Sequence, residues 1–184
     1  MTSESRGVNA VGPCDAAVLH MVCGKIASGK STLTTRLVDV PRTVLISEDQ
    51  WIACLYPDEI HTPADYVSRA ARMRTVLTEH ICSLLAAGIS VVLDFPFNTV
   101  NTRAWGRSLF QTVSCEHWLH YLDVSDAICK SRLMARNVSG EHPFQTSEAQ
   151  YDQITRYFVP PAPDEGFNII VYDETGKVCS RAGS

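Results

Sequence analysis

The 184-residue sequence contains neither an apolar run long enough to cross a bilayer nor an excess of positive charge. A membrane-spanning helix needs about 20 consecutive apolar residues, and the longest runs here resemble the short one at Ala16–Cys23. With 16 Lys and Arg against 20 Asp and Glu, the net charge is −4. This charge disfavours a general affinity for phosphate backbones, which basic proteins bind through clustered cations. We therefore expect no membrane contact and regard nucleic acid as the less favoured partner.

Paired cysteines are also absent. The seven cysteines are scattered, their number is odd, and no two form a C-x-x-C pair, so the sequence does not predict a disulfide scaffold. No charged stretch followed by an apolar stretch precedes Ala16, and we expect no secretory signal. Together these absences predict reduced thiols in a cytoplasmic protein.

The sequence does contain a regular alternation of short apolar runs with helical patterns. Short strands that alternate with helices predict βαβ units and a parallel sheet. We expect one α/β domain over residues 16–173, with flexible tails at 1–15 and 174–184. The five predicted strands span 16–23, 43–46, 89–95, 117–122 and 168–172, and the principal helices span 31–38, 64–87, 101–113, 125–136 and 147–158.

The first predicted strand leads into a segment that matches the pattern G-x-x-x-x-G-K-[ST]. Its glycines let the backbone curl close to a phosphate, and the curled N–H groups with the following helix N-terminus attract anions. The lysine of this pattern reaches the β- and γ-phosphates, and the hydroxyl ligates Mg²⁺. We therefore predict a three-layer P-loop NTPase fold that binds ATP and Mg²⁺ through Gly24, Lys25, Ile26, Ala27, Ser28, Gly29, Lys30, Ser31 and Thr32.

Carboxylates follow the second and third predicted strands. Glu48 and Asp49 come just after strand 43–46, and in a parallel sheet such positions line the ligand crevice. Either carboxylate is therefore a candidate base for the proton of an acceptor hydroxyl. Asp49 is also suited to cap a helix beginning near Gln50, a role that is compatible with catalysis. Asp94 ends the third strand after apolar residues, a pattern typical of a carboxylate that orients Mg²⁺.

Arginines follow the fourth predicted strand. Arg132 and Arg136 are four residues apart and share a helix face, and the glycine-containing segment 137–140 comes next. An arginine on a closing lid stabilises the charge of a transferring phosphoryl group, whereas the alternative role is to neutralise a helix C-terminus. Asn98 and Arg103, after the third strand, either contact the acceptor or serve the following helix.

Five segments, GKIASGKS, ISEDQW, VVLDFPFN, KSRLMARN and PPAPDEGF, resemble those of the small P-loop kinases of the AAA_33 type. The layout is similar to the kinase domain of phage polynucleotide kinase and to zeta-toxin and chloramphenicol phosphotransferase relatives, over about Val18 to Asp173. The resemblance implies that Asp49 is the base and that Arg132 and Arg136 act from the lid. Polynucleotide kinases of this type carry an arginine three positions after the base, where this sequence has Ile52.

The sequence therefore predicts a kinase that moves the γ-phosphate of magnesium-bound ATP to a hydroxyl of a small molecule. We expect Asp49, Lys30, Arg132 and Arg136 to be catalytic, and Ser31 and Asp94 to hold the metal. The helix at 64–87 is expected to form one wall of the acceptor site. Two alternatives remain: a 5′-hydroxyl polynucleotide kinase and a nucleotide-binding regulatory ATPase without an acceptor.

Overall fold

The computed structural model describes residues 16–139 and 146–183, so the predicted N-terminal tail and Gly140 of the predicted lid lie outside the described residues. The core of the fold is a six-stranded sheet in the order β2-β3-β1-β4-β5-β6. Strands β1 to β5 pair in parallel, and β6 pairs antiparallel with β5. The strands are β1 Val18–Cys23, β2 Thr43–Ser47, β3 Ser90–Pro96, β4 Glu116–Leu122, β5 Ile169–Tyr172 and β6 Val178–Ala182.

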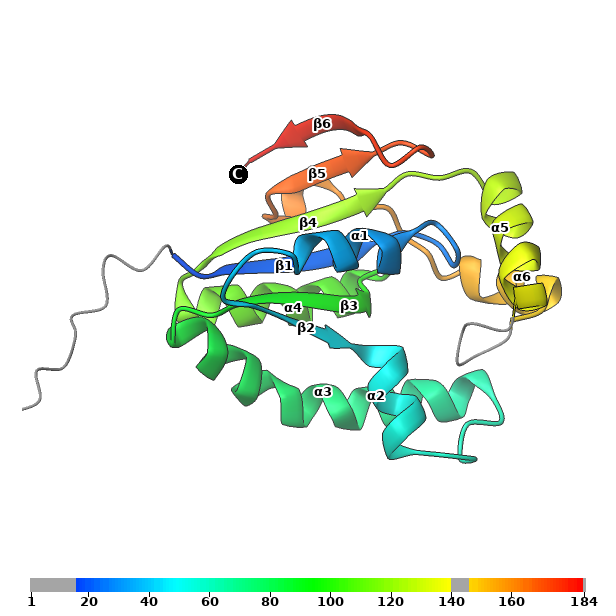
Figure 1. Cartoon of the computed structure of the whole chain (residues 1–184), viewed down its shortest axis with the longest axis horizontal. Coiled ribbons are helices and arrows are strands. Elements are labelled where there is room, and N and C mark those ends of the chain that lie inside the picture. The colour runs from blue at the N-terminus through cyan, green and yellow to red at the C-terminus, as the bar shows by residue number, and fades with distance from the viewer. Residues whose placement is uncertain (1–15, 140–145, 184) are drawn as a thin grey trace, which may run out of the picture.

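Helices complete the layers on both faces of this sheet. Figure 1 shows α1 against one face, α3 and α4 along the other, and α5 and α6 beyond the carboxyl ends of the central strands. Within residues 16–139 and 146–183, no helix combines the length and the apolar character that crossing a membrane would require. The helices are α1 Lys30–Leu37, α2 Glu48–Leu55, α3 Pro63–Ala86, α4 Val100–Val113, α5 Asp126–Ser139 and α6 Glu148–Thr155, with a 3₁₀ turn at Pro163–Glu165.

The predicted α/β architecture is confirmed, but the sheet has one more strand than we predicted. Val178–Ala182 falls in the expected C-terminal tail and instead forms β6 at the sheet edge. The turn before it is closed by Asp173, whose Oδ1 accepts bonds from the backbone N–H groups of Thr175 and Lys177 at 2.8 and 3.0 Å. Every residue of β6 is exposed, so this strand carries little of the apolar pattern by which the buried strands are recognised.

The main core lies between the sheet and the helices α3 and α4. Alternate residues of β1, including Leu19 and Met21, are fully buried in it, because successive strand residues point to opposite faces. Helix α4 comes very close to the sheet at Gly106, where a Cβ atom would lie 2.7 Å from Met21 Sδ. Helix α3 begins at Pro63 after Thr62, whose side chain accepts a bond from Asp65 N at 3.2 Å, as expected for a capped helix start.

The parallel strands bring four connections to one edge of the sheet. The glycine-rich loop follows β1, α2 follows β2, the segment from Phe97 to Thr99 follows β3, and α5 lies beyond β4. In open α/β sheets, ligands bind outside the carboxyl ends of the strands. The predicted site residues therefore belong to segments that meet where this fold binds ligands.

Candidate functional site

The glycine-rich loop has a backbone that only small residues permit. Gly24 and Gly29 have φ angles of 155° and 108°, and a Cβ atom on Gly24 would lie 2.6 Å from Ser28 Oγ. Ala27 also has a positive φ, 59°, which a small side chain tolerates better than a bulky one. The loop is closed by a bond from Ser28 N to Lys25 O at 3.2 Å. This curled backbone is the geometry expected for a phosphate-binding loop.

Three features of the loop fit a triphosphate. Lys30 Nζ donates to Gly24 O and Lys25 O, both at 2.8 Å, so its ammonium lies across the mouth of the loop. Ser28 Oγ is buried and has no hydrogen-bond partner among the described residues. Burial lowers the pKa of Lys30, and the carboxylates of Asp94 and Asp49 act against that shift. A cationic lysine, an unsatisfied hydroxyl and the N-terminus of α1 together suit an anionic ligand.

The two predicted magnesium residues lie on facing elements. Ser31 is exposed in the first turn of α1. Asp94 lies between Leu93 and Phe95, which are buried in the core under α3 and α4, so the alternation of the strand directs Asp94 to the face that α1 covers. A hydroxyl and a carboxylate are oxygen ligands of the kind that Mg²⁺ prefers, alongside substrate phosphates. The residues present therefore fit a magnesium ion bound together with a nucleotide.

The two candidate bases have different surroundings. Helix α2 begins at Glu48 with Ser47 as its N-cap, so the expectation that Asp49 caps a helix near Gln50 is wrong. Glu48 is fully buried, whereas Asp49 is half-buried and accepts a bond from Tyr66 Oη at 2.5 Å. Of the two carboxylates, only Asp49 is accessible from the site.

The two lid arginines reach different parts of the site. Arg132 Nη1 donates to Ser28 O of the glycine-rich loop at 3.2 Å, and Arg132 Nη2 donates to Glu174 O at 2.6 Å. Arg136, one turn further along α5, is half-buried; burial lowers its pKa, and the charge of Asp49 raises it. Arg132 therefore lies at the nucleotide loop, and Arg136 lies within electrostatic reach of Asp49.

Asn98 and Arg103 have separate roles that the sequence left open. Asn98 Oδ1 accepts a bond from Gly24 N at 2.9 Å, and Asn98 O accepts one from Val159 N at 2.9 Å. Arg103 is fully buried and pairs with Glu165, with Nε to Oε2 at 2.6 Å and Nη2 to Oε1 at 2.8 Å. Asn98 thus anchors the glycine-rich loop, while Arg103 is a structural residue and not an acceptor contact.

Sequence reasoning also missed Tyr66 and Arg74 of α3. The Tyr66 hydroxyl contacts Asp49 and Glu48. Arg74 pairs with Glu48 through Nη2 and Oε2 at 2.9 Å. The helical spacing of α3 predicts which of its residues face a neighbouring helix. It does not predict that Tyr66 and Arg74 meet the carboxylates of α2 there. The consecutive acids at Glu48 and Asp49 were the only available signal that partners were needed.

Comparisons with known proteins agree with this geometry. The family model described as AAA domain, AAA_33, matches residues 19–161. A search among curated proteins finds no match. Among solved structures, the fold is similar to that of a protein from Chloroflexus aurantiacus, with 21% identity, 87% of this chain and 86% of that chain covered, and a TM-score of 0.69.

Two further structures with the same fold carry nucleotide ligands. Kti12 of Chaetomium thermophilum, in complex with ADP-AlF3, has 14% identity, coverage of 84% and 88%, and a TM-score of 0.66. The APS kinase CysC of Mycobacterium tuberculosis, in complex with AMPPNP and APS, has 21% identity, coverage of 86% and 88%, and a TM-score of 0.56. The chain therefore belongs to the AAA_33 family, and it shares its fold with these structures.

Proposed function

We propose that this protein transfers the γ-phosphate of magnesium-bound ATP to a hydroxyl group of a small molecule. The observation that carries the proposal is the position of Asp49. Its carboxylate acts electrostatically on Lys30 of the glycine-rich loop and on Arg136 of α5. A carboxylate that interacts with both the phosphate-binding lysine and an arginine of α5 suits the role of base in phosphoryl transfer to a hydroxyl.

In the proposed step, Asp49 takes the proton of the acceptor hydroxyl while the acceptor oxygen forms a bond to the γ-phosphorus. The bond from that phosphorus to the β,γ-bridging oxygen breaks, and its electron pair leaves with ADP. Lys30 and Arg136 offset the negative charge that spreads over the phosphoryl oxygens. A magnesium ion held by Ser31 and Asp94 would neutralise part of the charge on the phosphates.

The presence of a buried isoleucine at position 52 favours a small-molecule acceptor over the end of a polynucleotide. This position, where related polynucleotide kinases carry an arginine, is fully buried in the core between the sheet and α3. The resemblance implies that this arginine contacts the acceptor side, and isoleucine cannot replace its charge. The net charge of −4 also provides no general attraction for a nucleic acid.

The direct test is transfer of label from [γ-³²P]ATP to ribose, adenosine, chloramphenicol and a 5′-hydroxyl oligonucleotide. We expect label on a small molecule and none on the oligonucleotide. Asp49→Asn should lower the transfer rate by about 100-fold or more, as loss of a general base does, with little change in ATP affinity. Asp39→Asn, at an exposed position before β2, is the matched control and should transfer at the wild-type rate.

Each alternative function predicts a different outcome of this labelling experiment. Preferential labelling of the oligonucleotide would contradict the small-molecule proposal and favour a polynucleotide kinase. ATP binding with slow hydrolysis and no labelled acceptor would favour a regulatory ATPase. If Asp49→Asn strongly weakened ATP binding while transfer at saturating ATP stayed near the wild-type rate, Asp49 would be a nucleotide-binding residue instead of the base.

A further inference from the structure

Asp49 is the first residue in a chain of polar contacts that connects α2 with α3. Tyr66 Oη lies 2.5 Å from Asp49 Oδ1 and 3.1 Å from Glu48 Oε1. Glu48 Oε2 accepts bonds from Arg74 Nε at 3.0 Å and from Arg74 Nη2 at 2.9 Å. The chain therefore links the accessible carboxylate to a buried one, and the buried one to a cation.

Both carboxylate oxygens of Glu48 have partners in this chain of contacts. Burial raises the pKa of Glu48, and the adjacent Arg74 guanidinium and the Tyr66 hydroxyl act in the opposite direction. A buried carboxylate that lost its cation would be left with an uncompensated charge, which is strongly destabilising. Arg74 thus holds the Glu48 carboxylate in place. Glu48 in turn contacts the Tyr66 hydroxyl, which contacts Asp49.

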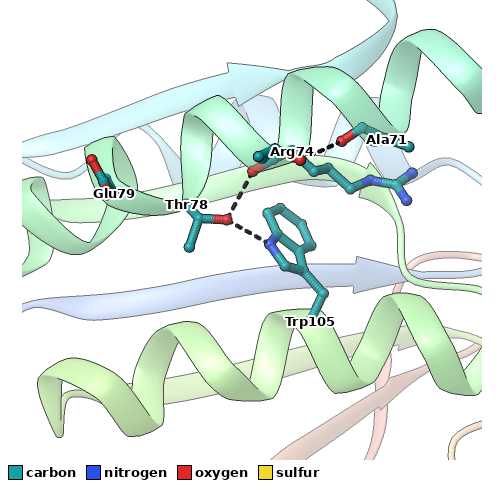
Figure 2. A pocket seen from close by; sticks show the side chains of 6 residues that line it. Ala71, Arg74, Thr78, Glu79 and Trp105 are labelled. Atoms are coloured by element: carbon teal, nitrogen blue, oxygen red, sulfur yellow. Dashed lines mark hydrogen bonds between the residues drawn. The ribbon is translucent and has the colours of Figure 1, made fainter.

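Arg74, the last residue in this series of contacts, lies over the indole ring of Trp105 in α4. The Arg74 guanidinium carbon lies 5.8 Å from the centre of this ring. Trp105 Nε1 donates to Thr78 Oγ1 at 3.0 Å, and Thr78 Oγ1 donates to Arg74 O at 2.8 Å (Figure 2). Trp105 itself stacks on Phe97, with ring centres 5.8 Å apart and planes 7° from parallel. The Arg74 guanidinium therefore lies beside a ring that is itself packed on the core.

Asp49 needs such support because its own element is short. Helix α2 has eight residues and follows β2, an edge strand of the sheet. Its neighbours Gln50 and Trp51 are exposed, so the helix is held against the core by Glu48 and Ile52, which are fully buried. A general base must stay within hydrogen-bond reach of the proton that it takes, and a displacement of about 1 Å can lower a rate by about 100-fold.

We propose that Tyr66 and Arg74 are positioning residues, and that they hold Asp49 in its catalytic orientation, Tyr66 directly and Arg74 through Glu48. The proposal rests on the function proposed above, in which Asp49 is the base. It places part of the catalytic geometry on α3, a helix separate from the glycine-rich loop and from the predicted lid on α5. Neither side chain is required for ATP to bind.

The test is a double-mutant cycle on phosphate transfer, with whichever of the four probe acceptors above is labelled fastest. Tyr66→Phe removes only the hydroxyl, and we expect kcat to fall about 10- to 100-fold with an unchanged KM for ATP. In an Asp49→Asn background the same substitution should have no further effect, because residues that act as a unit are not additive. Arg74→Met should behave in the same way and provides a second cycle if Tyr66→Phe folds poorly.

Two controls separate positioning from a loss of stability. Tyr172→Phe removes another buried tyrosine hydroxyl, which bonds His120 Nδ1 at 2.8 Å, and it should leave kcat unchanged. Arg72→Met removes an exposed arginine from the same helix as Arg74 and should also leave kcat unchanged. Thermal unfolding of each variant shows whether the protein remains folded at the assay temperature.

Three outcomes would overturn the proposal. The first is full transfer activity in folded Tyr66→Phe and Arg74→Met. The second is a loss that adds fully to that of Asp49→Asn, which would assign the effect to something other than Asp49. The third is a wild-type protein that labels none of the four probes; this outcome removes the proposed function as well, whereas the first two leave it intact.

Discussion

Three cations surround the candidate site, and each has a distinct set of partners. Lys30 lies over carbonyl groups of the glycine-rich loop, Arg132 bonds Ser28 O, and Arg136 interacts with Asp49. Charges in a site that excludes water act more strongly than charges on a surface. At the scale of single residues, we therefore propose that Lys30 binds the phosphates, that Arg132 stabilises the nucleotide loop and that Arg136 acts on the reacting group.

The first prediction concerns Lys30→Ala. Within residues 16–139 and 146–183, the hydrogen bonds of Lys30 Nζ go to the backbone carbonyls of Gly24 and Lys25 alone, so removal of this side chain should leave the fold intact. Loss of a positioned charge from a transition state commonly lowers kcat by about 100- to 1000-fold, and we expect a loss of that size. Steady-state transfer kinetics and circular dichroism of the variant measure the two effects. Wild-type turnover by the variant would contradict the assignment of Lys30.

The second prediction separates the two lid arginines. Arg132→Ala should raise KM for ATP with a smaller change in kcat, because Arg132 contacts the nucleotide loop. Arg136→Ala should lower kcat by about 10-fold or more with a smaller change in KM, because Arg136 interacts with Asp49. Both variants are compared at saturating and limiting ATP. If the two variants gave the same pattern, the division of roles would be wrong.

At the scale of secondary-structure elements, one buried arginine joins the carboxyl edge of the sheet to a distant segment. Arg103 of α4 pairs with Glu165, and its Nη1 donates to Val159 O at 2.8 Å and to Phe97 O at 3.2 Å. These bonds hold residues 159–165 beside Asn98, which anchors the glycine-rich loop. The segment PPAPDEGF and the preceding Val159 are thus connected through Asn98 to the glycine-rich loop.

The third prediction follows from this arrangement. Arg103→Met removes the cation and takes this partner away from Glu165 and from three carbonyl groups, those of Phe97, Val159 and Pro160. Breaking such a buried pair costs about 3–5 kcal/mol. Urea unfolding at neutral pH measures the loss. The double variant Arg103→Met with Glu165→Gln should recover part of it, because no unpaired carboxylate remains. A change below about 1 kcal/mol in the single variant would contradict the structural role of Arg103.

The limits of sequence reasoning appear at these same elements. The glycine-rich loop and the buried parallel strands were predictable because each carries a local pattern that its own physics requires, such as the positive φ angles of Gly24 and Gly29. The pairing of Arg103 with Glu165 joins residues 62 positions apart, and no local pattern connects them. Tyr66 was missed for the same reason. Strand β6 was missed because an exposed edge strand lacks an apolar pattern.

At the scale of the whole molecule, a row of polar side chains crosses the sheet within its buried strands. His20 Nδ1 lies 3.0 Å from His120 Nε2, and His120 Nδ1 lies 2.8 Å from Tyr172 Oη, so the row links β1, β4 and β5. Burial lowers the pKa of His120 to about 3, with further lowering by His20 and by Arg181. Burial also lowers the pKa of His20, which Glu116 partly opposes. Both imidazoles are therefore neutral in the folded protein near neutral pH.

The fourth prediction is that the free energy of unfolding decreases in acid because the two histidines of this row become protonated on unfolding. In the unfolded chain these histidines take up protons below about pH 6.5, whereas His120 in the folded protein does so only near pH 3. The unfolded state thus binds more protons in this window, and stability falls with decreasing pH, by up to about 1.4 kcal/mol per pH unit from His120. Urea unfolding at pH 7, 6, 5 and 4 measures the slope.

The control for this prediction is His120→Gln, which keeps a hydrogen-bonding side chain and removes the titrating ring. We expect the variant to lose less stability than the wild type between pH 6 and pH 4. Part of the slope should remain, since His20 still titrates and, below about pH 4.5, the lowered pKa of Glu165 contributes in the same direction. An unchanged slope in the variant would contradict the neutral state of His120.

The most direct test of the whole account is calorimetric titration of the protein with ATP in the presence of Mg²⁺. The account predicts saturable binding of one nucleotide per chain, with binding by Asp49→Asn about as tight as by the wild type and binding by Lys30→Ala clearly weaker. No saturable heat with either ATP or GTP would contradict the assignment of residues 24–32 as a nucleotide-binding loop, and the proposed phosphotransferase activity would fall with it.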